Sequence, residues 1–298
     1  MSSAVEVQQL VKRYGRVTAV DGVTLSVNSG EIVGYLGPNG AGKTTTIRCL
    51  LGLLRPSSGS VRLLGERLPD GLPGVLDDVG HIPGEFGLWP QLTGAGCLDY
   101  LGRLAHRRPR RRAELCDRFE LSETELARPV RYYSRGMRQK IAIVQAFQHG
   151  PELVIMDEPT EGLDPVMKER FLQLLHEHRA AGGSTLLSSH ILSEVEQVSD
   201  RVVVLRAGTV VREISRHDLE GRIRHCVVTF GPDAASAMPT TLPGAFNVAC
   251  VGDTLRFDHR GDMSALISAL AALPVVDFVS EPGSLLDVFF EVYGTDPR

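Results

Sequence analysis

One stretch of the sequence has the glycine, lysine and hydroxyl spacing of a phosphate-binding loop, G-x-x-x-x-G-K-[ST]. It comprises Gly37, Pro38, Asn39, Gly40, Ala41, Gly42, Lys43 and Thr44, with Thr45 directly after it. Glycines let consecutive backbone N–H groups converge on phosphate oxygens, because no Cβ stands in the way. The loop opens a predicted helix, whose N-terminal end adds positive partial charge. Lys43 can therefore reach β- and γ-phosphates, and Thr44 offers a hydroxyl to Mg²⁺.

A second chemical feature is the acidic end of an apolar run. Leu153–Met156 is apolar throughout, and Asp157 and Glu158 follow it. In a chain that also carries a phosphate loop, Asp157 is expected to hold Mg²⁺, directly or through water. Glu158 is expected to orient and polarise the water that attacks the terminal phosphate. Taken alone, an acidic pair at a strand end is equally consistent with an exposed turn.

Three further short motifs stand in a fixed order with these two. They are Tyr133-Ser134-Arg135-Gly136-Met137 before the acidic pair, and Gly162-Leu163-Asp164-Pro165 and Ser188-Ser189-His190 after it. This order resembles that of the ATP-binding cassette (ABC) ATPases, which carry a phosphate loop, a signature loop, an acidic pair, a D-loop and a switch histidine. The resemblance covers roughly residues 5–220.

The resemblance implies a homodimer in which two cassettes enclose two ATP molecules head to tail. Ser134 and the backbone of Gly136 would contact the γ-phosphate bound by the opposite subunit, and Asp164 would link the two sites. His190 would contact the γ-phosphate on its own side and sense its loss. Three residues are the catalytic candidates: Glu158, His190 and Lys43.

Three positions are open in this comparison. The family usually places a glutamine that touches Mg²⁺ where this chain has Gly84, and the neighbouring Glu85 could supply an oxygen instead. Arg135 stands where the signature loop usually has a glycine, and it either adds a cation beside the γ-phosphate or points outward. Tyr14 lies where the family has an aromatic residue that stacks on adenine, although a core position is an alternative.

The elements that must position these residues follow from the hydrophobic pattern. Strands are expected at Ile32–Leu36, Leu153–Met156, Thr185–Ser188 and Val202–Leu205, and helices at 43–53, 138–148, 166–180 and 191–198. This alternation predicts a parallel sheet covered on both faces. Val5–Leu10 and Val23–Val27 predict antiparallel strands at an edge, and residues 92–148 predict a helical insertion without a strand.

The predicted fold class is α/β, a P-loop NTPase of the ABC cassette type with a small α+β C-terminal domain. The cassette, residues 1–221, would combine a RecA-like parallel core, an antiparallel β subdomain and a helical subdomain at about 92–148. The accessory domain would span 222–298. Its strands are expected at Val227–Phe230, Asn247–Val251, Leu255–Asp258 and Val275–Ser280, its helices at 262–272 and 285–292, and a loop at 232–242.

Composition excludes several classes of protein. The 298 residues are 43% hydrophobic and 23% charged with a net charge of −4, which is ordinary for a globular protein and predicts no nucleic-acid partner. No apolar run reaches the about 18 residues of a membrane span, and the first residues do not resemble a secretory signal. The five cysteines form no CxxC pair and predict reduced thiols. The basic run at 106–112 predicts a solvated turn or, alternatively, contact with anionic lipid headgroups.

These features predict the nucleotide-binding subunit of a bacterial ABC-2 type exporter. ATP and Mg²⁺ would be its cofactors, and a separate ABC-2 type membrane permease its partner, which places it at the cytoplasmic face of the cell membrane. Ser284–Phe289 resembles the closing helix of that group. The transported substrate, whether a drug, antibiotic or lipid, is not encoded in these motifs. The alternatives are a soluble ABC ATPase outside transport and a regulatory ATP-binding module.

Overall fold

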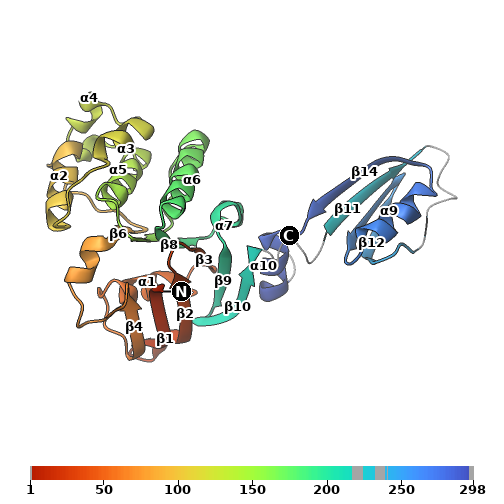
Figure 1. Cartoon of the computed structure of the whole chain (residues 1–298), viewed down its shortest axis with the longest axis horizontal. Helices are drawn as coiled ribbons and strands as arrows, with labels where there is room; N and C mark the ends of the chain where they lie inside the picture. Colours follow the sequence, from red (N-terminus) through yellow and green to blue (C-terminus); the bar gives the residue numbers. More distant parts are fainter. Residues whose placement is uncertain (1, 217–223, 232–238, 240, 295–298) are drawn as a thin grey trace. The chain divides into compact units, whose positions relative to one another are not determined.

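We describe a computed structural model of the chain, which covers residues 2–216, 224–231, 239 and 241–294. The contacts between residues divide the chain into two compact units, Met1–Glu213 and Ile214–Arg298. Each unit is described by itself (Figure 1). The predicted boundary between residues 221 and 222, and most of the predicted loop at 232–242, lie outside the described residues.

The first unit is built on a six-stranded sheet with the order β10-β9-β3-β8-β7-β6. Its strands are β3 (Ile32–Leu36), β6 (Val79–Ile82), β7 (Leu153–Asp157), β8 (Ser184–Ser189), β9 (Arg201–Arg206) and β10 (Thr209–Ser215). The five strands from β9 to β6 are parallel to their neighbours. Every residue of β3, β7 and β8 is buried, as expected for a parallel sheet with both faces covered.

The register of this sheet brings the chemical motifs together. Asp157 pairs with Ser188, and Leu36 pairs with Ser189. The carboxyl ends of β3, β7 and β8 therefore lie at one edge of the sheet, so the loops that follow these strands are neighbours. Helices α1 (Lys43–Leu50), α6 (Pro165–Ala180) and α7 (Leu192–Val198) come after those loops.

A second, antiparallel sheet has the order β2-β1-β4-β5. Its strands are β1 (Ser3–Tyr14), β2 (Val17–Asn28), β4 (Ser58–Leu63) and β5 (Glu66–Arg67). Val5, Val7 and Leu10 of β1 share one buried cluster with Ile47 of α1 and Leu153 of β7. This shared core fixes α1, and with it the phosphate loop, between the two sheets.

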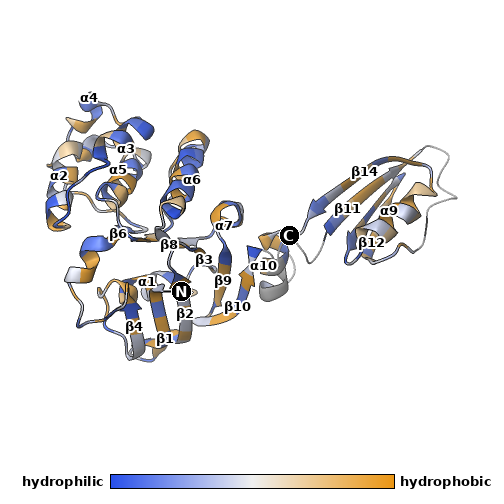
Figure 2. Ribbon diagram, viewed as in Figure 1, coloured by the Kyte–Doolittle hydropathy of each residue, from blue (hydrophilic) through white to orange (hydrophobic). Residues whose placement is uncertain are grey.

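Helices occupy the stretch between β6 and β7 (Figure 1). They are α2 (Gly94–Leu104), α3 (Arg112–Arg118), α4 (Glu123–Leu126), the 3-10 turn η2 (Val130–Tyr132) and α5 (Arg135–Phe147), and a further 3-10 turn, η1 (Gly74–Asp78), precedes β6. Hydrophobic and hydrophilic residues alternate along α5 and α6 (Figure 2). The buried side chains of α5 include Ile141, Val144 and Phe147. The predicted absence of strands across 92–148 is confirmed.

In its described residues, the second unit forms an antiparallel sheet with the order β12-β13-β11-β14, together with the helices α9 and α10. Its elements are β11 (Arg224–Phe230), β12 (Ala245–Val251), β13 (Thr254–His259), α9 (Met263–Ala271), β14 (Val275–Pro282) and α10 (Leu285–Tyr293). Leu266 and Leu270 of α9 pack with the sheet residues Val228 and Phe257. His225 bridges two carboxylates, with Nδ1 2.7 Å from Asp258 Oδ1 and Nε2 2.9 Å from Asp287 Oδ2.

Most predicted elements are confirmed, and the differences have local causes. The strands β4, β5, β6 and β10 were not predicted, because short runs such as Val79–Ile82 contain glycine and histidine and lack a clear period. The helix predicted at 43–53 ends at Leu50. The helix predicted to begin at 138 begins at Arg135, since the Ser134 side chain caps it by accepting a hydrogen bond from Met137 N.

Two composition-based predictions can be followed in the structure. All five cysteines are free thiols. In the basic run, Arg107 pairs with Asp78, and Arg111 pairs with Glu114. The run therefore forms ion pairs with η1 and with α3. Within the described residues, no helix has the length and hydropathy needed to cross a membrane.

Candidate functional site

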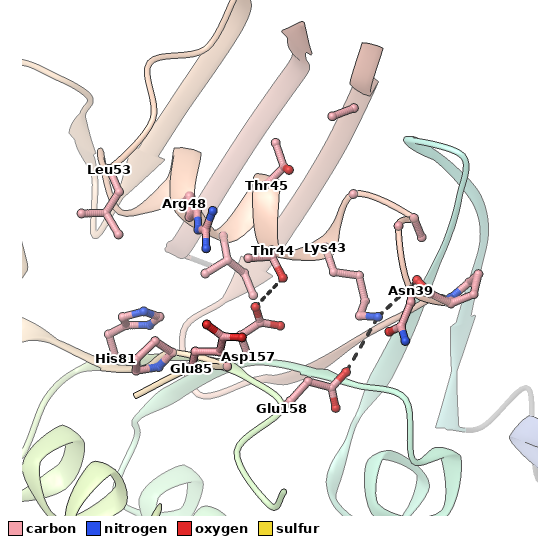
Figure 3. Close-up of a pocket in the computed structure, with 18 residues that line it drawn as sticks. Asn39, Lys43, Thr44, Thr45, Arg48, Leu53, His81, Glu85, Asp157 and Glu158 are labelled. Carbon is pink, nitrogen blue, oxygen red and sulfur yellow. Dashed lines mark hydrogen bonds and ion pairs between the residues drawn. The ribbon is translucent and has the colours of Figure 1, made fainter. Parts of the chain in front are cut away.

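A cleft of about 780 Å³ opens where β3, β6 and β7 end and α1 begins (Figure 3). Its volume is in the range of small-molecule sites. The residues that line it come from the phosphate loop and α1, the start of β2, the β6 edge and the acidic strand end: Ala19, Pro38, Asn39, Gly40, Ala41, Gly42, Lys43, Thr44, Thr45, Ile47, Arg48, Leu53, His81, Pro83, Gly84, Glu85, Asp157 and Glu158.

The phosphate loop has the backbone shape of an anion site. Gly42, the N-cap of α1, has φ 107°, and a Cβ there would stand 2.5 Å from the carbonyl oxygen of Ala19. Only glycine fits this position. No side chain caps α1, so the N–H groups of its first turn are directed to the cleft without a competing side-chain acceptor. The buried Lys43 ammonium donates to the carbonyl oxygen of Gly37 at 2.5 Å.

Asp157 is a buried carboxylate held by two hydroxyl groups. Thr44 Oγ1 donates to its Oδ2 at 2.6 Å, and Ser188 Oγ donates to its Oδ1 at 2.9 Å. One donor comes from the first turn of α1 and the other from β8. The carboxylate is thereby fixed at the floor of the cleft, beside the helix that begins with Lys43.

Glu158 follows in an unusual backbone conformation. Its φ of 52° is in the left-handed region, which is uncommon for a residue with a side chain and costs of order 1 kcal/mol. This turn directs its carboxylate back over the cleft (Figure 3). Its Oε1 lies 3.8 Å from Lys43 Nζ, and its Oε2 lies 2.6 Å from His190 Nδ1 and accepts from the His190 backbone N–H at 3.2 Å. The three catalytic candidates therefore form one chain of contacts.

The oxygen atoms at this edge of the cleft are suited to bind Mg²⁺. Thr44 and Asp157 present oxygen atoms 2.6 Å apart, and Glu85 lines the same cleft. Oxygen donors of this kind suit a hard cation, which keeps several waters and takes further ligands from phosphates. In the described part of the chain, no group of three or more His, Cys, Asp or Glu side chains forms a self-sufficient metal cage. The residues therefore fit a magnesium ion that arrives with a nucleotide.

The β6 edge of the cleft carries the departure from the glutamine pattern. A Cβ at Gly84 would lie 3.4 Å from Asp157 Oδ2, so this position is directly beside the acidic strand end. Glu85 follows it and is exposed in the cleft. His81 also lines the cleft, and its Nδ1 is 2.9 Å from the carbonyl oxygen of Ile155. Burial lowers the pKa of His81, so the ring is neutral and its Nδ1–H is the donor.

Several predicted site residues lie outside this cleft. They are Tyr14, Gly37, Ser134, Arg135, Gly136, Asp164 and His190, the last of which still contacts the cleft residue Glu158. Tyr14 is 46% exposed at the end of β1, with Lys12 Nζ 5.2 Å from its ring centroid, so it is not a core residue. Ser134 is the N-cap of α5, and Asp164 is the N-cap of α6, where it accepts from Met167 N at 3.0 Å. The chain does not fold its own signature loop onto its own phosphate loop.

Comparisons with known proteins agree with this geometry. Residues 20–161 match the family model for ABC transporters. The chain is 34% identical to the Nod factor export ATP-binding protein I of Ralstonia nicotianae, over 98% of this chain and 94% of that protein. This chain is an ABC transporter ATP-binding protein. It is also 36% identical to the bacitracin transport ATP-binding protein BcrA of Bacillus licheniformis, over 75% of this chain and 74% of that protein.

Solved structures confirm the fold class of the ABC cassette. One, described as the ATP-binding subunit of an ABC transporter, has a TM-score of 0.69 and 35% identity over 73% of this chain and 92% of its own. Another is a dimeric cassette in a post-hydrolysis state with ADP and Pi, with a TM-score of 0.64 and 25% identity over 71% of this chain and 98% of its own. This ABC protein is accordingly an ATPase subunit that binds ATP.

Some residues of the cassette site were missed by sequence reasoning. Ser188 was quoted only as part of the histidine motif, yet it donates to Asp157. His81, Arg48 and Leu53 line the cleft without any signal in the sequence, because β6 is short and α1 shows only its apolar period. Strand register, which the sequence does not reveal, is what brings Ser188 to Asp157.

Proposed function

We propose that this ABC ATPase is the nucleotide-binding subunit of an exporter, in which ATP binding and hydrolysis in a cassette dimer drive a separate ABC-2 type permease. The observation that carries the proposal is the convergence of Lys43, Thr44, Asp157 and Glu158 in one cleft, with His190 held against Glu158 beside it. Export is supported by the names of two relatives, a Nod factor export ATP-binding protein and a bacitracin transport ATP-binding protein. A drug, an antibiotic or a lipid-like molecule is the substrate class we propose.

In the nucleotide-bound cassette, the N-terminal N–H groups of α1 would hold phosphate oxygens, and Lys43 would move from the carbonyl of Gly37 to the β- and γ-phosphates. Thr44 and Asp157 would hold Mg²⁺, with Glu85 as a further oxygen ligand at the position next to the absent glutamine. The ion would neutralise charge on the phosphates. Tyr14, exposed at the end of β1, would stack on the adenine.

Glu158 would act on the attacking water. Its carboxylate would accept a proton from the water as the oxygen attacks the γ-phosphorus, and the bond to ADP would break in line. His190 already contacts Glu158 through both its ring and its backbone N–H. It would hold the carboxylate in place and contact the γ-phosphate. Loss of the phosphate would therefore remove a contact of the segment that leads into α7.

The dimer follows from the residues that stay outside the cleft. Ser134 and Asp164 are exposed and Gly136 is half-buried in the first turn of α5, where a second cassette could reach them. In the proposed head-to-tail dimer, Ser134 and Gly136 would complete the partner's ATP site, with the N-terminal end of α5 directed at its γ-phosphate. The dimeric cassette among the similar structures supports this arrangement.

The membrane partner would dock on the loop before α2 and on α2 itself. Trp89 and Tyr100 are 42% and 45% exposed, and their rings pack edge to face with centroids 4.7 Å apart. Leu92 and Leu104 are exposed on the same segment. An exposed apolar and aromatic group of this kind is typical of a protein interface. It begins a few residues after Glu85, so a permease held there would be next to the nucleotide cleft, at the cytoplasmic face of the membrane.

The decisive test of turnover uses Glu158→Gln, which keeps the shape of the side chain and removes its charge. We expect Mg-ATP hydrolysis by the purified chain to fall by a factor of about 10²–10⁴, the range for loss of a general base, while ATP binding is retained. Glu123→Gln, on the exposed surface of α4, makes the same chemical change as a control. Equal turnover in Glu158→Gln and the wild type would contradict the proposal and favour a regulatory ATP-binding module.

A further inference from the structure

The first two turns of α5 pack against the loop that follows Glu158. The buried Gln139 side chain donates to the carbonyl oxygen of Pro159 at 2.5 Å. Gly136 comes so close to the same loop that a Cβ on it would stand 2.8 Å from the carbonyl oxygen of Gly162. The signature segment and the loop at 159–163 therefore pack without an intervening side chain at this point.

Arg135 adds a charged contact between the same two segments. Its guanidinium forms an ion pair with the Glu161 carboxylate. Its aliphatic stem lies against Gly162, where a Cβ would be 3.1 Å from Arg135 Cγ and 3.2 Å from Cδ. Gly162 has φ 85°, a conformation that glycine adopts at little cost. In this loop, Gly162 packs against the aliphatic part of Arg135 and Glu161 pairs with its guanidinium.

The position of this pair gives it a mechanical consequence. Arg135 directly follows Ser134, and Glu161 is three residues after Glu158, which itself sits at a strained turn. Side chains of Arg135 and Glu161 are 66% and 41% exposed, so the pair lies on the surface that carries the signature loop. Arg135 and Glu161 therefore form a direct connection from Ser134 to the loop that follows Glu158.

The far side of the same loop is also held. Thr160 Oγ1 donates to the buried Glu194 carboxylate of α7, and Lys168 Nζ of α6 lies 2.8 Å from the other oxygen of Glu194. The loop at 159–163 is thus held by α5 on one side and by α6 and α7 on the other, so its position depends on both sets of contacts. A change at the signature loop would therefore alter the position of Glu158.

We propose that Arg135 is a positioning residue that couples the two ATP sites of the dimer, by linking the signature loop to the Glu158 loop of its own subunit through Glu161. The inference rests on the head-to-tail dimer proposed above. It assigns Arg135 to the carboxylate within its own chain and not to the partner's phosphate, because the stem and the guanidinium are both already placed on 161–162.

The test is a charge swap measured in the full-length chain. Arg135→Glu and Glu161→Arg are made singly and together, and ATP hydrolysis is followed for kcat, KM and the Hill coefficient for ATP. Exposed ion pairs shift equilibria by up to roughly fivefold. We expect each single variant to lower kcat about three- to fivefold and to move the Hill coefficient toward one, with KM within about twofold. The double variant should recover most of both losses.

Matched variants separate coupling from folding and from phosphate binding. Arg128→Glu makes the same charge change on an exposed residue of the helical segment and should behave as wild type. Arg135→Lys keeps the charge and should retain the Hill coefficient. If the double variant is as inactive as Arg135→Glu, Arg135 acts on the partner's phosphate and the inference is overturned. Unchanged singles also overturn it, whereas a wild type without Glu158-dependent turnover overturns the proposed function itself.

Discussion

Two buried hydroxyl groups on β8 should respond in opposite ways to removal. Ser188 and Thr185 are both 0% exposed. Ser188 Oγ donates to Asp157 Oδ1 at 2.9 Å, whereas Thr185 Oγ1 has no hydrogen-bond partner among the described residues. Ser188→Ala therefore leaves a buried carboxylate oxygen without its donor. Thr185→Val replaces an unsatisfied hydroxyl with a methyl group of the same shape.

The magnitudes follow from the charge of the acceptor. A hydrogen bond to a charged group contributes about 1.5–3 kcal/mol, so Ser188→Ala should destabilise the cassette by that amount. At roughly 2–4 °C per kcal/mol for a unit of this size, the Tm should fall by roughly 3–12 °C. Thr185→Val should be neutral or stabilise by up to about 1 kcal/mol, because the desolvation penalty of a lone hydroxyl is removed.

The assay combines thermal unfolding without nucleotide and a Mg²⁺ titration of ATP hydrolysis. Since Ser188 also orients Asp157, Ser188→Ala should raise the Mg²⁺ concentration needed for half-maximal turnover, and Thr185→Val should not. If both variants lose equal stability, the cost is one of packing on β8 and the reasoning is refuted. An unchanged Tm and Mg²⁺ dependence for Ser188→Ala would also refute it.

Three other outcomes are expected. Glu85→Ala should weaken the apparent Mg²⁺ affinity for hydrolysis severalfold, and an unchanged Mg²⁺ titration would remove Glu85 from the site. The hydrogen bond to Asp287, helped by Asp258 and opposed by partial burial, raises the pKa of His225 above its usual 6.5. Protonated His225 stabilises the folded second unit. This contribution to the free energy of unfolding is complete below pH 6.5 and is lost as pH rises through the raised pKa, so the Tm of the second unit should fall toward alkaline pH. His225→Gln should flatten that dependence in pH-dependent melting curves, and a slope equal to wild type would contradict it. Trp89→Ala should weaken ATP-dependent association with the proposed membrane partner about 30-fold or more, because a hot-spot aromatic contributes about 2 kcal/mol or more. Intrinsic turnover should stay within about twofold. Association at wild-type strength, measured by co-purification, would move the docking surface elsewhere.

Sequence reasoning located the parallel core because its strands leave a strong apolar signal. Ile32–Leu36 and Leu153–Asp157 are buried on both faces, so their composition alone marks them. The same reasoning missed β6, which has four residues and includes Gly80 and His81. Edge strands of this kind are specified by their neighbour β7 rather than by their own pattern.

The chemistry of the site was predictable where a motif has fixed spacing. Lys43, Thr44 and Asp157 were expected near one another, and the structure places them in one cleft. The contacts of Ser188 and Arg135 were not predictable, because they depend on strand register and on how α5 approaches the loop at 159–163. A residue type gives the chemistry that a side chain can do, but only the fold determines its partner.

The exporter assignment is tested most directly by capture of the membrane partner. A tagged Glu158→Gln chain, held with Mg-ATP in its native cells and purified in mild detergent, should be trapped in the nucleotide-bound state because hydrolysis is blocked. We predict that a polytopic membrane protein co-purifies in stoichiometric yield, and that Trp89→Ala in the same background loses it. Recovery of ribosomes, nucleic acid or no membrane protein at all would contradict the exporter function, even with ATP hydrolysis intact.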